Sequence, residues 1–164
     1  MSDTLEIYRL CRKKYAVELV ASGLSNRWNR ESQKVLYCAS SRSLASLELM
    51  VHRSRLMPED PYLTLVISIR EPGQMVSSLP LTSLPKNWRS LEAYGTLQIL
   101  GSNWYEQQNS LALQIPSLVI PQEYNYVINT VHPAFKTHVF IKAREEYFWD
   151  KWLFPPKGNS AKPG

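Results

Sequence analysis

The sequence has little that would suit a secreted, disulfide-bonded or membrane-spanning protein. Of its 164 residues only two are cysteines, and the spacing of Cys11 and Cys38 matches no metal or redox motif. No apolar run reaches the roughly 18 residues that a membrane-spanning helix needs. Residues 1–6 contain neither the basic nor the apolar segment of a secretory signal. We therefore expect a cytoplasmic protein that makes no membrane contact and keeps its thiols reduced.

Motifs for binding metals and nucleotides are also missing. There is no Gly-x-Gly-x-x-Gly turn, no Walker loop and no zincin helix. The three histidines, His52, His132 and His138, are too widely scattered to form a metal motif. We therefore expect no bound metal.

Positive charge exceeds negative charge. Nineteen lysines and arginines against 14 acidic residues give a net charge of +5, which suits an anionic partner such as a nucleic acid, an acidic protein or a phosphate-bearing ligand. Many of the cations occur early in the chain: Arg9, Arg12, Lys13, Lys14, Arg27, Arg30, Lys34 and Arg42. The clustering favours a local anion site over a uniformly charged surface, although a small domain of this kind can also be simply basic. A rival of another class is a non-catalytic basic module that binds nucleic acid or a partner protein.

The apolar pattern predicts more strands than helices. Helices are expected at residues 41–53 and 94–108, and residues 123–128 form a strand or a turn. Strands are expected at residues 5–10, 35–39, 62–69, 110–116, 135–142 and 146–149. Because the strands do not alternate regularly with helices, we predict an α+β fold in a single compact domain, residues 1–154, followed by a disordered tail, residues 155–164.

The helix at residues 41–53 places a glutamate where an apolar residue is expected. Glu48 occupies the i+4 position of an apolar stripe formed by Leu44, Leu47 and Val51. The polar residues of this helix, Arg42, Ser46 and Arg53, lie on the opposite face. A carboxylate in apolar surroundings is costly unless it is paired or used in function. Glu48 is therefore either a buried structural carboxylate paired with an arginine or part of a functional site.

A set of motifs follows in a fixed order along the chain. They are Tyr8-Arg9-Leu10, Arg27-Trp28-Asn29, and residues 35–41, 44–48, 84–88, 100–104, 113–121, 123–129, 132–133 and 148–150. In order and spacing they resemble the RES domain, found in toxins of bacterial toxin–antitoxin pairs, over residues 7 to 153. The family usually has two glycines before the Arg-Trp-Asn motif. Here Ser25 and Asn26 stand in their place, which predicts a loop of different shape.

The resemblance implies a fold and a chemistry. RES domains are similar to mono-ADP-ribosyltransferases, so a mixed β-sheet core flanked by helices is expected, with NAD as substrate and no Rossmann turn to bind it. The implied reaction cleaves the nicotinamide–ribose bond through an oxocarbenium-like transition state. Water or phosphate would accept the ADP-ribose, and the loss of NAD would arrest growth. The alternative implied by the family is a mono-ADP-ribosyltransferase that modifies a protein.

The resemblance also implies a partner and roles for residues. The partner is an Xre-type helix-turn-helix antitoxin, through which alone the chain would associate with DNA. Glu48 would stabilise the ribosyl cation, and Arg9 and Arg27 would bind the phosphates. Tyr37 would stack on nicotinamide or its ribose. Ser117 would form a hydrogen bond with the nicotinamide amide or a ribose hydroxyl, without acting as a nucleophile.

Expectations also follow for four further residues within the motifs. Asn129 and His132 are expected at the edge of the site. Trp28 and Trp88 are expected in the core. The predicted catalytic set is therefore Glu48, Arg27 and Ser117, and the predicted binding set adds Arg9 and Tyr37.

Overall fold

The computed structural model describes residues 3–52, 59–150 and 152. The strands in this part are β1 (Thr4–Arg12), β2 (Val35–Ala39), β3 (Tyr62–Arg70), β4 (Val76–Ser78), β5 (Ala112–Pro116), β6 (Tyr124–Asn129) and β7 (Val139–Glu146). The helices are α1 (Arg42–His52), α2 (Pro72–Met75), α3 (Tyr94–Gln107) and α4 (Phe135–His138), with short 3-10 turns at Lys13–Tyr15, Leu81–Ser83 and Leu91–Ala93. This is the predicted α+β fold with a mixed sheet.

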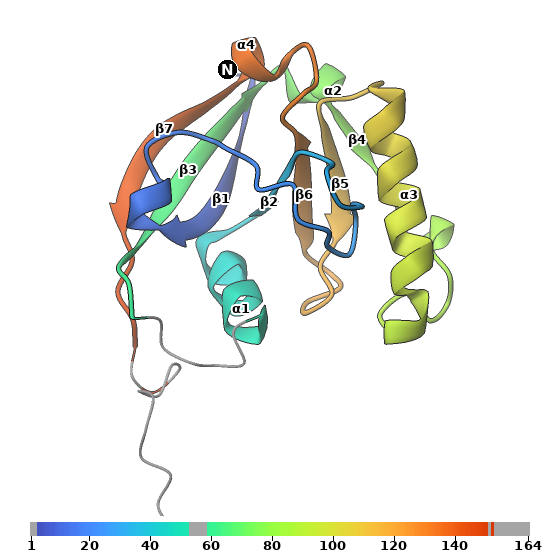
Figure 1. Cartoon of the computed structure of the whole chain (residues 1–164), viewed down its shortest axis with the longest axis horizontal. Helices are drawn as coiled ribbons and strands as arrows, with labels where there is room; N and C mark the ends of the chain where they lie inside the picture. Colours follow the sequence, from blue (N-terminus) through green and yellow to red (C-terminus); the bar gives the residue numbers. More distant parts are fainter. Residues whose placement is uncertain (1–2, 53–58, 151, 153–164) are drawn as a thin grey trace, which may run out of the picture.

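The strands form one seven-stranded sheet in the order β4-β5-β6-β2-β1-β3-β7. The β4–β5 pair is parallel and the other pairs are antiparallel. In Figure 1, α3 lies along one side of the sheet, next to β4 and β5, and α1 lies near the lower ends of β1 and β6. The two longer helices therefore lie at different positions: α3 lies beside the sheet, and α1 lies at one end of the strands.

The centre of the sheet is weakly joined. β1 pairs with β3 over nine residues, from Thr4 opposite Arg70 to Arg12 opposite Tyr62. β1 and β2, in contrast, share the single register pair of Tyr8 and Ala39. Because hydrogen bonds do not hold these two strands together along their length, the sheet opens between them.

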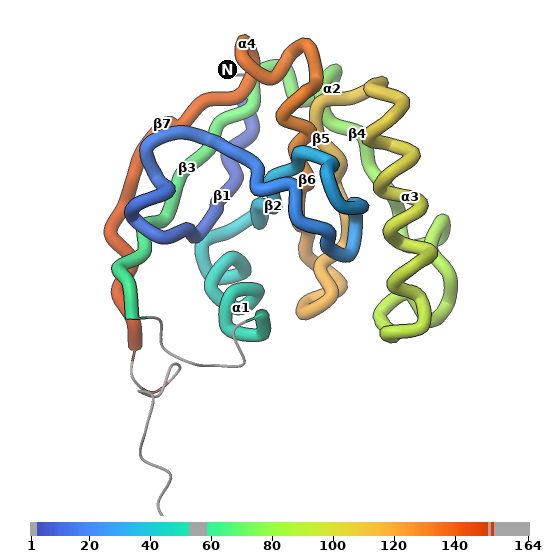
Figure 2. The backbone as a smooth tube through the Cα atoms, in the orientation of Figure 1, coloured from blue at the N-terminus to red at the C-terminus, as the bar shows by residue number. Residues whose placement is uncertain are grey.

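The connection from β1 to β2 covers this region. Figure 2 shows that residues 13–34 run from the β1 side toward β5 and β6 before the chain turns back into β2. Gln98 of α3 ties the far end of this connection in place, because its Nε2 donates hydrogen bonds to the carbonyl oxygens of Asn26 and Asn29, each at 3.1 Å. The Arg27 region is thus fixed by a helix more than 60 residues later in the chain.

Apolar side chains of the strands pack on both faces of the sheet, as the period-2 alternation of strands predicts. One cluster contains Ile7, Leu36, Leu65, Ile67, Ile69 and Ile128. A second cluster packs under α3 and contains Trp28, Trp88, Leu97, Trp104, Leu113 and Val127. The prediction that Trp28 and Trp88 belong to the core is therefore confirmed, with 4% and 8% of their surface exposed.

The predicted closing strands were partly wrong. Residues 135–138 form helix α4, and a single strand, β7, replaces the two expected at 135–142 and 146–149. The backbone N–H of Ala134 donates to Nδ1 of His132 at 3.0 Å, which favours a helical turn before the strand begins. The predicted tail, residues 155–164, and Arg53 lie outside the described residues.

The structure also bears on the two cysteines and on the length of the helices. Cys38 is buried and Cys11 is half-buried, and neither forms a disulfide. Burial raises the pKa of the Cys38 thiol to about 12, so this side chain is a poor nucleophile. None of the helices in the described segments combines the length and apolarity needed to span a bilayer.

A glycine sets the distance between α3 and the Arg27 loop. A Cβ atom at Gly101 would lie 1.9 Å from the carbonyl oxygen of Trp28. We therefore expect Gly101→Ala to lower the free energy of unfolding by roughly 1–3 kcal/mol, because the helix must move away from the loop. Gly95→Ala is the matched control in the same helix, since beyond the adjacent residues and the helix's own backbone nothing lies within 4 Å of the added carbon. Thermal unfolding of both variants measures the difference, and equal melting temperatures would contradict this close packing.

Candidate active site

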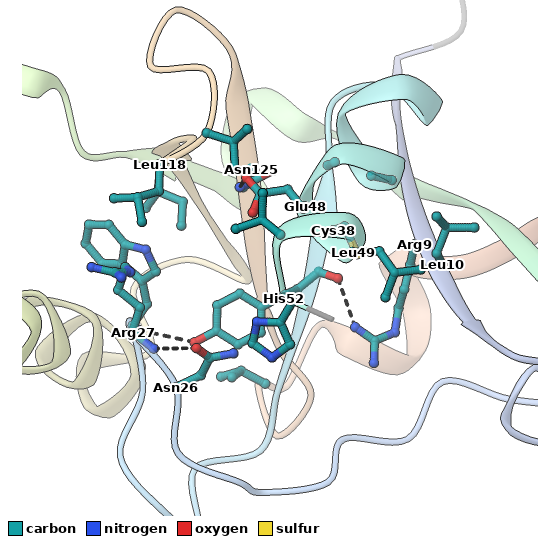
Figure 3. Close-up of a pocket in the computed structure, with 18 of the residues that line it drawn as sticks. Arg9, Leu10, Asn26, Arg27, Cys38, Glu48, Leu49, His52, Leu118 and Asn125 are labelled. Carbon is teal, nitrogen blue, oxygen red and sulfur yellow. Dashed lines mark hydrogen bonds between the residues drawn. The ribbon is translucent and has the colours of Figure 1, made fainter. Parts of the chain in front are cut away.

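A cavity of about 750 Å³ lies where β1 and β2 separate. Its walls come from β1, β2, α1, the loop around residues 22–28 and the adjoining ends of β5 and β6. Figure 3 shows Arg27 and Arg9 on opposite sides of this pocket, with His52 between them in the view and Glu48 above it. Four of the five predicted site residues, Arg9, Arg27, Tyr37 and Glu48, line the cavity. The fifth, Ser117, does not line the cavity but donates a hydrogen bond to Glu48, which does.

Glu48 points from α1 to the ends of β5 and β6. Its Oε1 accepts a hydrogen bond from Ser117 Oγ at 2.7 Å and a second from Asn125 Nδ2 at 2.7 Å. Its Oε2 accepts none from the residues that the structure describes. Both partners are neutral, so among the described residues Glu48 does not pair with an arginine, the alternative that sequence reasoning left open. The carboxylate therefore has one oxygen, Oε2, that is available to a ligand.

The apolar stripe predicted around Glu48 was only partly correct. Leu44 is fully buried and Leu47 is half-buried, but Val51 is 60% exposed. The first turns of α1 pack against the sheet through Leu44 and Ala45, whereas its last turn extends beyond the strands. Glu48 therefore sits at the border between the packed and the open part of the helix, beside the pocket.

Ser117 is fully buried just after β5, and a turn fixes its hydroxyl group. Its Oγ accepts hydrogen bonds from the backbone N–H groups of Val119 and Ile120, each at 3.1 Å. A hydroxyl has one hydrogen to donate, and here it goes to Glu48. The contacts made by Ser117 therefore orient the carboxylate.

The two arginines differ in how they are held. Arg9 Nη1 donates to the carbonyl oxygen of Tyr37 at 2.9 Å, across the opening between β1 and β2. Arg27 places its guanidinium 5.3 Å from the centre of the Tyr94 ring, and its Nη1 is buried without a hydrogen-bond partner. A buried cationic donor that lacks a partner is costly, so Arg27 has unused capacity to bind an anion.

The loop that carries Arg27 does not need the glycines usual in the family. Neither Ser25 nor Asn26 has a positive φ. Asn26 and Asn29 form a small antiparallel bridge, and Asn26 Oδ1 accepts a hydrogen bond from the backbone N–H of Arg27 at 2.8 Å. The loop is therefore stabilised by a side chain that glycine lacks.

Tyr37 joins this loop to the sheet. Its hydroxyl donates to Asn29 Oδ1 and accepts from the backbone N–H of Trp28 at 3.2 Å. Burial raises the pKa of the Tyr37 hydroxyl, so the side chain stays neutral. Tyr37 is also one of the residues that line the cavity.

Two expected site residues lie elsewhere, and several others were missed. Asn129 donates to the carbonyl oxygen of Tyr105, and His132 contacts that of Gln108, so both support the end of α3 instead of the pocket edge. The pocket residues that sequence reasoning did not assign include Tyr94, His52 and Asn125. Asn125 stands 77 positions from Glu48, and no local spacing signals their contact. In the described part of the chain, no group of three or more metal-ligating side chains is found.

The amino-acid sequence was compared with family models and with known proteins. The model of the RES domain matches residues 6–150. The Prs ADP-ribosylating toxin of Sphingobium sp. (strain YBL2) is 37% identical over 80% of this chain and 78% of that protein. Toxin Res of Photorhabdus laumondii subsp. laumondii is 31% identical over 92% of this chain and 98% of that protein.

Structural comparison agrees at the level of the fold. A chain from the crystal structure of the M. tuberculosis MbcT–MbcA toxin–antitoxin complex superposes with a TM-score of 0.68 and 13% identity, covering 90% of this chain and 86% of that one. The family predicted from the ordered motifs is thus confirmed by the sequence comparisons: the chain belongs to the RES domain family of toxins.

Proposed function

We propose that this chain is the toxin of a toxin–antitoxin pair and that it cleaves the nicotinamide–ribose bond of NAD. The observation that carries the proposal is the state of Glu48. One oxygen of its carboxylate is held by two neutral donors, and the other accepts no hydrogen bond from a described residue, in a cavity that also contains two arginines. Such an arrangement suits a cationic transition state next to bound phosphates.

The reaction follows from these positions. As the bond between ribose C1′ and the pyridinium nitrogen breaks, its electron pair goes to nitrogen and nicotinamide leaves as a neutral molecule. Positive charge then develops on the ribose, where Glu48 stabilises it. Water or phosphate attacks C1′, gives up a proton to solvent and completes hydrolysis or phosphorolysis.

The arginines and Tyr37 bind the rest of the substrate. A guanidinium matches phosphate oxygens in pairs, so Arg9 and Arg27 are assigned to the pyrophosphate. Arg27 Nη1, buried without a partner, gains an acceptor when the phosphate arrives. The ring of Tyr37 gives a flat surface for the nicotinamide or its ribose. Ser117 acts through Glu48, which assigns its hydroxyl to the carboxylate instead of to the nicotinamide.

A second acceptor is a protein side chain, which would make the chain a mono-ADP-ribosyltransferase. The name of the Sphingobium relative supports this alternative. So does the pocket rim, where Leu24 and Val51 are 71% and 60% exposed and could contact a protein. A non-catalytic module for nucleic acid fits less well, because the Glu48 carboxylate lines the cavity and would repel the phosphates of a nucleic acid there.

The partner in this proposal is an antitoxin with an Xre-type helix-turn-helix domain. A toxin–antitoxin complex with the same fold supports a partner of this general kind. An acidic segment or chain terminus of the antitoxin would bind Arg9 and Arg27 and block the cavity. Release of nicotinamide from NAD by the purified chain, followed by chromatography with and without the antitoxin, tests both parts of the proposal.

The two arginines should govern the affinity for NAD. We expect Arg9→Ala and Arg27→Ala each to raise KM for NAD by roughly 10- to 100-fold, because a charge-assisted contact with phosphate is lost. Lysine should restore little, since it lacks the planar fork. Steady-state kinetics measure the change.

Arg70→Ala is the control for these variants. Arg70 is exposed at the end of β3, where its guanidinium lies 4.9 Å from the centre of the Phe140 ring, and it does not line the cavity. A rise in KM of the same size in all three variants would indicate general electrostatic attraction of NAD and would contradict specific phosphate binding.

A further inference from the structure

Asn125 lies at the centre of the sheet, at the end next to α1. It stands in register with Ala39 of β2 and with Ile115 of β5. From this place its side chain reaches Glu48 and forms part of the cavity wall (Figure 3). We propose that Asn125 is a positioning residue for the reaction: it holds one oxygen of Glu48 so that the other faces the ribose. This inference rests on the proposed cleavage of NAD.

The chemistry of the contact fixes how the amide of Asn125 is turned. An ionised carboxylate only accepts hydrogen bonds, so the group of Asn125 that faces Glu48 must be its N–H donor. Asn125 Nδ2 and Ser117 Oγ meet at the same oxygen, Oε1, each at 2.7 Å. Two donors from different strand ends thereby set the rotation of the carboxylate, which leaves Oε2 as the oxygen that acts on substrate.

The other half of the Asn125 amide indicates that stability is not the reason for this residue. Its Oδ1 is buried and has no hydrogen-bond partner. A buried acceptor without a partner lowers the free energy of unfolding, and an apolar residue of similar size would avoid that cost. An asparagine that is unfavourable for folding but makes a good contact with Glu48 is best explained by function.

Glu145 offers a comparison, because its carboxylate is paired with an arginine and lies outside the cavity. Both oxygens of Glu145 accept hydrogen bonds from the Arg42 guanidinium, each at 2.8 Å. The hydrogen bonds and the positive charge of Arg42 lower the pKa of Glu145, and the guanidinium charge offsets the charge of the carboxylate. Glu48 is held by a neutral amide and a neutral hydroxyl, which orient the carboxylate and leave its negative charge available to the ribosyl cation.

The first variant separates positioning from stability. We expect Asn125→Leu to lower kcat roughly 10- to 100-fold, with little change in KM and with an unchanged or higher melting temperature. Asn129→Leu is the matched control in the same strand. Its amide is fully buried and satisfied on both sides, by the carbonyl oxygen of Tyr105 and the backbone N–H of Val131. It should lower the melting temperature and preserve kcat of the folded protein.

The second variant gives a signature in pH. Asn125→Asp puts a second carboxyl group beside Glu48, and the pair shares a proton at low pH because two close negative charges repel. The protonated group can again donate to Glu48. We therefore expect the kcat of this variant, relative to wild type, to rise as the pH falls from about 8 to about 5.

The outcomes are distinct. Wild-type kcat in Asn125→Leu, a loss of kcat that follows a loss of melting temperature, or a pH-independent ratio for Asn125→Asp would each overturn the positioning role while NAD cleavage stands. Absence of NAD cleavage by the wild-type chain would overturn the proposed function and, with it, this inference. A low kcat with intact stability, together with recovery at low pH in the aspartate variant, supports both.

Discussion

Glu48→Gln is expected to lower kcat for NAD cleavage roughly 100- to 1,000-fold, the effect typical of losing one preorganised electrostatic group. The amide keeps the shape of the side chain, and its oxygen can still accept from Ser117 and Asn125. The charge that stabilises the ribosyl cation is lost. KM should change little, because the phosphate contacts assigned to the arginines remain. Nicotinamide release under saturating NAD measures the effect.

A glutamate far from the cavity provides the control for this variant. Glu71 is exposed and pairs with His138 at 2.9 Å, at the α4 end of the sheet (Figure 1). Glu71→Gln should leave kcat unchanged. A wild-type rate of NAD consumption by Glu48→Gln would show that the central residue of the site has been assigned wrongly.

The second large effect is expected in living cells. Expression of this chain alone should stop bacterial growth, and NAD should fall before protein synthesis does. The reason is that the residues in the cavity suit cleavage of the glycosidic bond of NAD. Time courses of NAD, protein synthesis and cell density after induction test this order of events.

Two controls make the growth experiment decisive. Expression of Glu48→Gln at the same level should leave growth and NAD intact, and co-expression of the antitoxin should restore both in cells with the wild-type chain. Growth arrest with constant NAD would contradict NAD depletion and would favour modification of a single target protein. No arrest from a folded protein would favour the binding module.

Much of the fold was predictable from local patterns. The β-branched run at residues 62–69 became β3, and the predicted helices at 41–53 and 94–108 became α1 and α3 with small changes at their ends. The failures came where a local side-chain hydrogen bond, or the placement of a helix against the sheet, overrode the pattern. Residues 135–138 became a helical turn after His132 bonded to the backbone. The apolar appearance of Val51 misled because the last turn of α1 extends past the sheet.

The pocket was predicted through the family resemblance, and its internal contacts were not. Arg9, Arg27, Tyr37 and Glu48 line one cavity, but the sequence alone offers no reason to join them, since they come from four separate segments. The contact between Glu48 and Asn125 depends on the register of β6 with β2 and β5, which a one-residue shift would abolish. Strand register is a global property, so no local motif encodes it.

The most direct test of the central claim is to identify the bond that is cleaved. Purified chain would be incubated with NAD in ¹⁸O-labelled water, with and without phosphate, and the products analysed by mass spectrometry. We predict free nicotinamide together with ADP-ribose that carries the label at C1′, or ADP-ribose 1-phosphate when phosphate is the acceptor. Unchanged NAD, or cleavage at the pyrophosphate to nicotinamide mononucleotide and AMP, would contradict the assignment of Glu48 to the ribosyl cation.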